Sequence, residues 1–117
     1  MKNGSRYFIK IVENQGDYVF QFWYIAKQEM GSSKIYNTYK ECVEGVISFK
    51  EYLRRFNPSE ENGFIKISKL GERYYKYEFY DENGLLLYAS RKIESKANCK
   101  KSMASTCKHF VEAEIYQ

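Results

Sequence analysis

Few of the residues that usually carry out chemistry are grouped in this sequence. The three cysteines, Cys42, Cys99 and Cys107, fall at helical spacing within two apolar segments, so we expect buried core thiols rather than nucleophiles. The single histidine, His109, stands late in the second segment, where a cation interacts favourably with a helix C-terminus. Because no pair of these residues has zinc-site spacing, no metal or cofactor site is predicted.

The carboxylates are not arranged for catalysis either. Asp17 and Asp81 are the only aspartates, and both fall in predicted turns, where this residue is favoured for backbone reasons. Gly63 and Gly71 lack the neighbours of a phosphate-binding loop. Enzymes need a nucleophile, a base and an orienting group in one place, and no segment supplies that set. We therefore expect no enzymatic activity and name no catalytic residue.

Positive charge is concentrated late in the chain, although the formal net charge of +4 is mild. The residues concerned precede or belong to a predicted helix: Arg91, Lys92, Lys96, Lys100 and Lys101. On that helix they lie on the side away from the apolar stripe. Such a basic patch is either an ordinary solvated helix face, which is the simpler interpretation, or a site for phosphate groups.

A second candidate surface is one face of the predicted sheet. Alternation with period two places these residues away from the helices: Phe8, Val19, Trp23, Phe64 and Tyr80, with Lys10, Lys66 and Lys76 among them. Aromatic and basic residues on an open sheet stack bases in some RNA-binding folds, which makes single-stranded nucleic acid the alternative ligand. An apolar face of this kind is more often covered, by a second protein molecule, by a partner, or by the chain's own terminal segment.

The elements that position these residues are clearest in the second half of the chain. A strand over 74–80 precedes Asn83-Gly84, a strong hairpin signal because both residues tolerate the positive φ of a type I′ turn. A strand over 85–89 follows, and Ser95 can cap a helix. The apolar residues of that helix are spaced at helical period: Cys99, Met103, Cys107 and Phe110.

The first half has the same pattern. Strands are predicted over 7–13, 18–25 and, with a weaker pattern, 30–35. Thr38 and Glu41 form a capping box at the start of a helix, in which Gly45 indicates close approach to the sheet. The inward residues of the two halves match at an offset of 56 before the first turn and 57 after it. We therefore predict a single domain, 1–117, of two repeats, about 7–54 and 64–117, joined by a linker over 55–63.

The order of strand, glycine turn, aromatic strand, Asn83-Gly84, strand ending in Ser90, and then Ser95-Lys96-Ala97-Asn98-Cys99 resembles the YegP-like family of uncharacterised bacterial proteins. The repeat of that family is known as domain of unknown function 1508. The resemblance covers nearly the whole chain and is weakest over 25–36. It implies an α+β fold, in which two tandem β-β-β-α units form one antiparallel sheet about a pseudo-two-fold axis with both helices on one face. It also implies a short strand over 113–116 that crosses to the other half, and no activity.

Composition limits the remaining possibilities. Of the 117 residues, 44% are hydrophobic and 18% aromatic, which is ample for a folded core. No apolar run is long enough for a membrane span, and the N-terminus does not look like a secretion signal. An odd number of cysteines with no close pair fits a reducing cytoplasm. We therefore expect a small cytoplasmic binding or protein-interaction module without cofactors, its function unknown, that acts through a homodimer or another protein partner.

Overall fold

Three strands precede a helix in the first half, as expected from the sequence, and the second half has the same order with one short extra strand before its helix. The structure is a computed structural model that describes residues 6–25, 28–56 and 64–116. Its elements are β1 (Tyr7–Asn14), β2 (Asp17–Tyr24), β3 (Gln28–Ser33), α1 (Tyr39–Phe56), β4 (Ile65–Leu70), β5 (Tyr74–Tyr80), β6 (Leu86–Ser90), β7 (Ile93–Glu94), α2 (Lys96–His109), the 3-10 helix η2 (Phe110–Glu112) and β8 (Glu114–Ile115). Neither β7 nor η2 was expected from the sequence.

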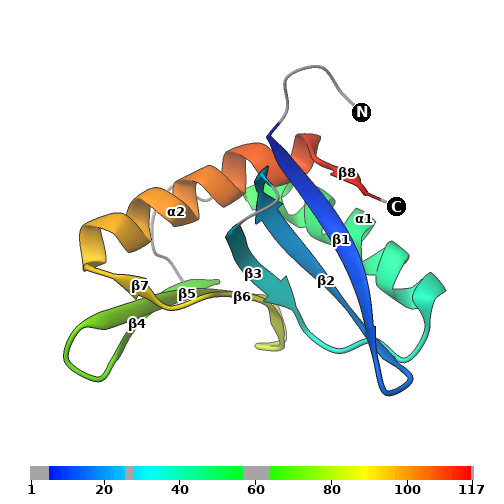
Figure 1. Cartoon of the computed structure of the whole chain (residues 1–117), viewed down its shortest axis with the longest axis horizontal. Coiled ribbons are helices and arrows are strands. Elements are labelled where there is room, and N and C mark those ends of the chain that lie inside the picture. The colour runs from blue at the N-terminus through cyan, green and yellow to red at the C-terminus, as the bar shows by residue number, and fades with distance from the viewer. Residues whose placement is uncertain (1–5, 26–27, 57–63, 117) are drawn as a thin grey trace.

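All eight strands belong to one sheet, against which α1 and α2 pack (Figure 1). The strand order is β4-β5-β6-β3-β2-β1-β8, and β7 continues beside β5 where β6 ends. The expected α+β fold is confirmed, and so is the strand after the second helix that crosses to the first half. The sheet is not wholly antiparallel, however, because β8 pairs with β1 in parallel. The reason is that α2 and η2 carry the chain back over the sheet, so that it reaches β1 running in the same direction.

The two halves meet where β3 pairs with β6. Ser32 lies opposite Ala89 at the middle of this pairing. On either side, the backbone N–H of Lys34 donates to the Leu87 carbonyl at 3.2 Å, and that of Arg91 donates to the Met30 carbonyl at 3.1 Å. At the offset of 57, Lys34 corresponds to Arg91 and Met30 corresponds to Leu87. A pseudo-two-fold rotation that exchanges the two halves therefore places each of these hydrogen bonds on the other. The weakly patterned third strand of the first half is paired on both sides, with β2 and with β6.

A serine ends the third strand of each half in the same way. The hydroxyl of Ser33 accepts a hydrogen bond from the backbone N–H of Phe20 at 2.9 Å and donates to the Lys34 carbonyl at 2.7 Å. In the second half, Ser90 accepts from Tyr77 at 3.0 Å and donates to Arg91 at 2.8 Å. Each hydroxyl therefore satisfies a buried backbone donor at the point where the ladder between strands ends.

The core lies between the sheet and the two helices. Phe22 and Phe79 are fully buried there with Val46 and Met103, as expected. The ring of Phe49 from α1 lies 4.9 Å from that of Phe110, so the core is continuous beneath both helices. One expected core position differs, because Thr106 of α2 is fully buried whereas Cys107 beside it is only half-buried.

The turn types differ from those expected. The β1–β2 hairpin has the two-residue loop Gln15-Gly16, with φ of 56° and 89°, which is the positive φ of a type I′ turn. The prediction of that turn type at Asn83-Gly84 is wrong, since of these two residues only Gly84 has positive φ, at 83°. The Asp81 carboxylate accepts hydrogen bonds from the N–H groups of Asn83 and Leu85, which favours a three-residue loop. The corresponding positions of the first half, 26–27, lie outside the described residues.

Both helices begin at the expected capping residue. Thr38 accepts a hydrogen bond from the backbone N–H of Glu41 at 3.0 Å, and Ser95 accepts one from Asn98 at 3.1 Å. Gly45 of α1 does admit a close neighbour, but it is the ring of Tyr36 rather than a strand of the sheet. None of the described helices is both long and apolar enough to span a membrane.

Candidate functional site

The outer face of the sheet, opposite the helices, carries an apolar group of side chains in the first half. The register of β1 and β2 places Phe8 beside Trp23 and Val12 beside Val19. The rings of Phe8 and Trp23 are nearly parallel, with centroids 6.2 Å apart, and the ring of Tyr116 lies 5.3 Å from that of Phe8. We call these five residues the outer patch. Val12 and Tyr116 were not singled out from the sequence, although Val12 follows Phe8 at the period of two along β1.

Polar contacts hold Trp23 in place. Its indole N–H donates to the side-chain oxygen of Gln21 at 3.0 Å, and Lys10 brings its ammonium group to 5.9 Å from the ring centroid. That distance is typical of a cation–π interaction. Trp23 is half-buried, so one side of a large aromatic residue is open to a partner.

The equivalent positions of the second half repeat these contacts with more charge. Lys66 lies 5.4 Å from the ring centroid of Tyr80, and the Tyr80 hydroxyl donates to Glu78 at 3.0 Å. In place of a valine, Lys76 forms an ion pair with Glu78 at 3.1 Å. The outer face is therefore apolar over β1 and β2 but charged over β4 and β5.

The five residues expected on this face are not all brought together. Phe8, Val19 and Trp23 gather in the outer patch, and Tyr80 lies on the same face in the other half. Phe64, which precedes β4, packs against the buried core instead. Alternation along a strand does not fix a residue that stands outside the strand.

The basic residues before and on α2 are dispersed by the structure. Lys96, Lys100 and Lys101 are exposed on α2, as a solvated helix face requires. Lys92 turns away to lie 4.7 Å from the ring centroid of Tyr74. Arg91 lines a pocket on the helix side. These five residues do not form one continuous patch.

Cysteine and histidine occupy structural positions. Burial raises the pKa of Cys42 to about 11 and that of Cys107 to about 12, so both thiols keep their protons near neutral pH and are poor nucleophiles. His109 stacks on Tyr7 with ring centroids 4.2 Å apart. Within the described ranges no three His, Cys, Asp or Glu side chains are placed to hold a metal ion.

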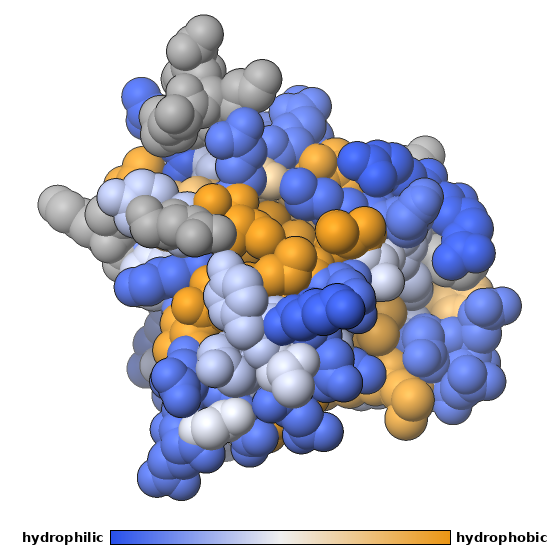
Figure 2. Space-filling view, turned by 90° about the vertical axis from the view of Figure 1, so that its right-hand side faces the viewer, coloured by the Kyte–Doolittle hydropathy of each residue, from blue (hydrophilic) through white to orange (hydrophobic). Residues whose placement is uncertain are grey.

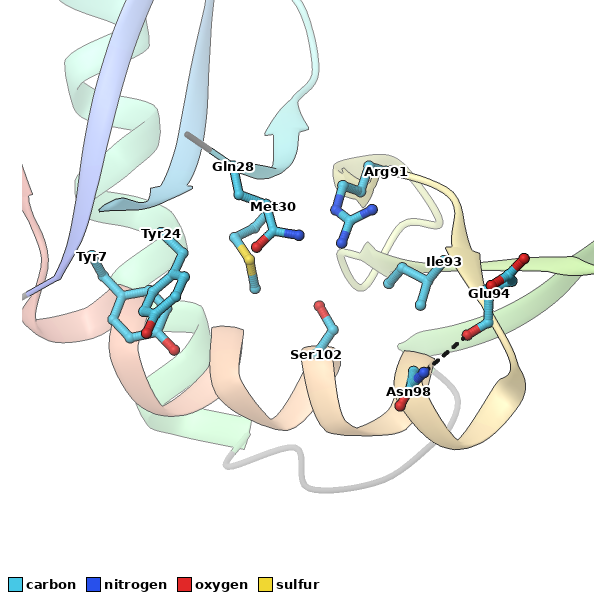
Figure 3. Close-up of a pocket in the computed structure, with 9 residues that line it drawn as sticks. All are labelled: Tyr7, Tyr24, Gln28, Met30, Arg91, Ile93, Glu94, Asn98 and Ser102. Carbon is cyan, nitrogen blue, oxygen red and sulfur yellow. Dashed lines mark hydrogen bonds between the residues drawn. The ribbon is translucent and has the colours of Figure 1, made fainter. Parts of the chain in front are cut away.

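The pocket that Arg91 lines lies between α2 and the strands of both halves, with a volume of about 370 Å³ (Figure 3). Arg91, Met30 and Ser102 point toward its centre, and the rings of Tyr7 and Tyr24 lie together at one side. The full lining is Tyr7, Tyr24, Gln28, Met30, Arg91, Ile93, Glu94, Asn98 and Ser102. The buried hydroxyl of Tyr77 bonds to the lining residue Ser102 at 3.1 Å and to Thr106 at 2.6 Å, and burial raises the pKa of Tyr77 to about 12.

Apolar side chains gather on one further part of the surface. They lie at the centre of the view in Figure 2, on the side of the molecule where α1, β1 and β8 are found. The apolar residues of these elements that reach the surface include Ile11, Val43, Ile47 and Ile115. Lys50 connects α1 to this edge, because its ammonium group donates to the Ala113 carbonyl at 2.6 Å.

Two solved structures share this arrangement. The solution NMR structure of UPF0339 protein SO3888 from Shewanella oneidensis superposes with a TM-score of 0.77 and 10% sequence identity, covering 94% of this chain and 89% of that one. The solution NMR structure of yegP from E. coli, a protein of unknown function, superposes with a TM-score of 0.76 and 8% identity over 94% of this chain and 90% of that one. The chain has the YegP fold. No family model and no curated sequence matches the chain. The likeness to yegP is therefore one of fold and brings no activity with it.

Proposed function

We propose that this chain is a small, non-catalytic interaction module that self-associates through the outer patch. The observation that carries the proposal is the contrast between the two halves of the outer face. Over β1 and β2 the half-buried positions of this face hold Val12, Val19 and Trp23, whereas the equivalent positions of the second half hold Ser68, Lys76 and Tyr80. An apolar surface confined to one half is typical of an interface.

A second molecule of the same chain fits this patch better than a charged ligand does. In a two-fold symmetric dimer the outer patch of one molecule contacts the outer patch of the other. The valines of each patch then face apolar side chains, and each Trp23 is buried near the centre of the interface. Lys10 is the only cation that reaches the Trp23 ring among the described residues, and Gln21 beside it is neutral. The three free cysteines, two of them buried, support a cytoplasmic location for such a dimer in a bacterium.

Trp23 supplies its own assay, because it is the only tryptophan. Sedimentation velocity and tryptophan emission are measured from about 10 μM to about 1 mM, a range that covers weak association. We expect a dimer to form with rising concentration and the emission to shift to shorter wavelength as the indole leaves water. Trp23→Ala should remain a monomer with the same far-UV circular dichroism, whereas the matched control Tyr80→Ala should dimerise like the wild type.

A monomer at every concentration overturns the proposal, and so does equal dimerisation of Trp23→Ala. A monomeric Trp23→Ala that melts far below the wild type would assign Trp23 to the fold instead of the interface. Circular dichroism melts of the same samples distinguish that result from loss of the interface.

Single-stranded nucleic acid is the second candidate, because a lysine lies beside an aromatic ring on both halves of the outer face. Bases that stack on Trp23 would quench its emission, and the affinity would fall steeply with salt because phosphate contacts release counterions. Titration with a mixed-sequence oligonucleotide at low and high salt measures both effects. Salt-sensitive quenching favours this candidate over self-association, since an apolar interface loses little affinity as salt rises.

A further inference from the structure

The pocket beside α2 corresponds to a place in the first half that the protein fills with its own side chain. At the offset of 57, Ile93 and Ser102 occupy the positions of Tyr36 and Gly45. The ring of Tyr36 lies against α1 at Gly45, so closely that an added Cβ would be 2.3 Å from the tyrosine oxygen. In the second half the residue equivalent to Tyr36 is Ile93, which has no ring, although the hydroxyl of Tyr77 reaches Ser102 from the core. Ile93 and Ser102 line a space of about 370 Å³.

In the first half a cationic side chain lies beside the Tyr36 ring, and the second half has a cation at the equivalent position. In the first half, Lys34 places its ammonium group 5.3 Å from the centroid of the Tyr36 ring. Its counterpart is Arg91, whose guanidinium group points into the open centre of the pocket (Figure 3). A guanidinium group can bind a carboxylate through two parallel hydrogen bonds.

The charge of Arg91 is available to a ligand. Among the described residues no carboxylate forms an ion pair with it. Glu94 also lines the pocket, but its carboxylate is paired with Arg73. The hydrogen bond of Arg91 to the carbonyl of Lys92 is long, at 3.3 Å, and leaves most of its N–H donors for another acceptor.

We propose that this pocket binds a small molecule with one aromatic ring and one carboxylate. The ring takes the place that Tyr36 fills in the first half, against Met30, Ile93 and Tyr24. The carboxylate faces Arg91, and Ser102 and Gln28 offer further hydrogen bonds from two sides of the pocket (Figure 3). A space of this size holds one ring, near the lower limit of small-molecule pockets. The site lies on the helix side of the sheet and does not involve the outer patch.

Benzoate is the probe, because it consists of the two proposed groups and little else. Its binding is measured by chemical-shift changes in two-dimensional NMR spectra of the full chain. We expect saturable binding with a Kd of about 1 mM, since a ligand of so few atoms gains limited affinity. Benzyl alcohol, which lacks the charge, and acetate, which lacks the ring, should each bind at least about tenfold more weakly.

Two substitutions and a matched control test the assigned residues. Arg91→Gln should weaken benzoate about tenfold, whereas Lys92→Gln removes the same charge one residue away and should leave binding unchanged. Ile93→Tyr places in the pocket the ring found in the first half, so it should abolish benzoate binding and raise the melting temperature. The fold of each variant is checked by its circular dichroism.

Three results would overturn the proposal. The first is no saturable shift up to about 20 mM benzoate, well above the expected Kd. The second is acetate binding as tightly as benzoate, which would mean an unspecific anion site. The third is equal binding by Arg91→Gln and Lys92→Gln. This last comparison decides the question even where Ile93→Tyr fails to fold, and none of the three depends on whether the outer patch forms a dimer.

Discussion

The first half of the chain presents valines and Trp23 on the outer face of the sheet, whereas the second half presents an ion pair between Lys76 and Glu78 there. On the helix side the contrast is reversed. The first half closes the space beside its helix with Tyr36, and the second half leaves a pocket at Ile93. The halves agree in their buried phenylalanines and their strand-ending serines. Several of the positions that differ, among them Val19 and its counterpart Lys76, are partly open to solvent, where packing constrains the residue type less.

The two halves also differ at the middle of the molecule, where β3 pairs with β6 and the halves cannot be identical. Gly31 of β3 and Tyr88 of β6 are equivalent positions on either side of the central pairing. An added Cβ at Gly31 would lie 2.5 Å from the hydroxyl oxygen of Tyr88. One half therefore supplies a large ring near the pseudo-two-fold axis and the other supplies the space for it. Two tyrosines would clash there, so packing at an axis breaks the symmetry of the sequence.

The largest effect should come from the phenylalanines that both halves share. Phe79→Ala should lower the free energy of unfolding by roughly 3–5 kcal/mol, and its counterpart Phe22→Ala by a similar amount, because both rings are fully buried. Chemical denaturation monitored by circular dichroism measures both. A melting temperature of Phe79→Ala within a degree or two of the wild type would contradict the placement of this ring in the core.

Alkaline pH should destabilise the protein through buried tyrosines of both halves, because the pKa values of Tyr36, Tyr52 and Tyr77 are all raised to about 12. An unfolded tyrosine loses its proton near pH 10, whereas folded Tyr77 has a pKa raised to about 12 by burial. Burial also raises the pKa of Tyr88 well above its usual value. The unfolded state therefore loses protons first, so the stability present below pH 10 falls as the pH rises toward 12, by about 3 kcal/mol for Tyr77.

The control for this effect comes from the first half, where the residue equivalent to Tyr77 is Phe20. Tyr77→Phe should therefore reduce the slope of stability against pH above pH 10, measured by denaturation at several pH values. An unchanged slope in this variant would show that other groups cause the alkaline loss.

The strand-ending serines should matter equally. Ser33→Ala and Ser90→Ala each leave a backbone N–H, of Phe20 or of Tyr77, without its buried acceptor. Each should cost roughly 1–2 kcal/mol in denaturant unfolding, and Ser105→Ala on α2 should change little. A loss at only one of the two serines would mean that the matching hydrogen bonds do not stabilise the two halves equally.

The smallest effect should come from the first hairpin of each half. Gly16 and Gly71 have φ of 89° and 67°, and an added Cβ at either would meet nothing within 4 Å. The added methyl group would therefore strain only the backbone conformation. Gly16→Ala and Gly71→Ala should each lower the free energy of unfolding by about 1 kcal/mol, measured by thermal unfolding. A much smaller loss at Gly71 would indicate that the three-residue loop of the second half relaxes more easily than the two-residue loop of the first.

Local spacing in the sequence determined most of the elements. Period-two alternation placed Phe20 and Phe22 on the helix side, and helical spacing placed Val46 and Met103 beneath the helices. Thr38 and Ser95 marked where the helices begin, because a capping hydroxyl acts within three residues of its own position. The offset of 57 relates Ser33 to Ser90, and the hydrogen bonds of these two serines match. The sequence also identified Phe8, Val19 and Trp23 as neighbours, since they lie on adjacent strands of one hairpin.

Contacts between distant parts of the chain decided the rest. Thr106 turns inward in place of Cys107 because the hydroxyl of Tyr77, 29 positions earlier in the chain, needs a buried partner. The parallel pairing of β8 with β1 joins Ile9 to Ile115, almost the whole length of the chain apart. The pocket depends on residues of β1, β2, β3, β7 and α2 together with Arg91. Periodicity cannot reveal such groupings, because it reports which side of an element a residue occupies, and only the packed structure determines what lies against that side.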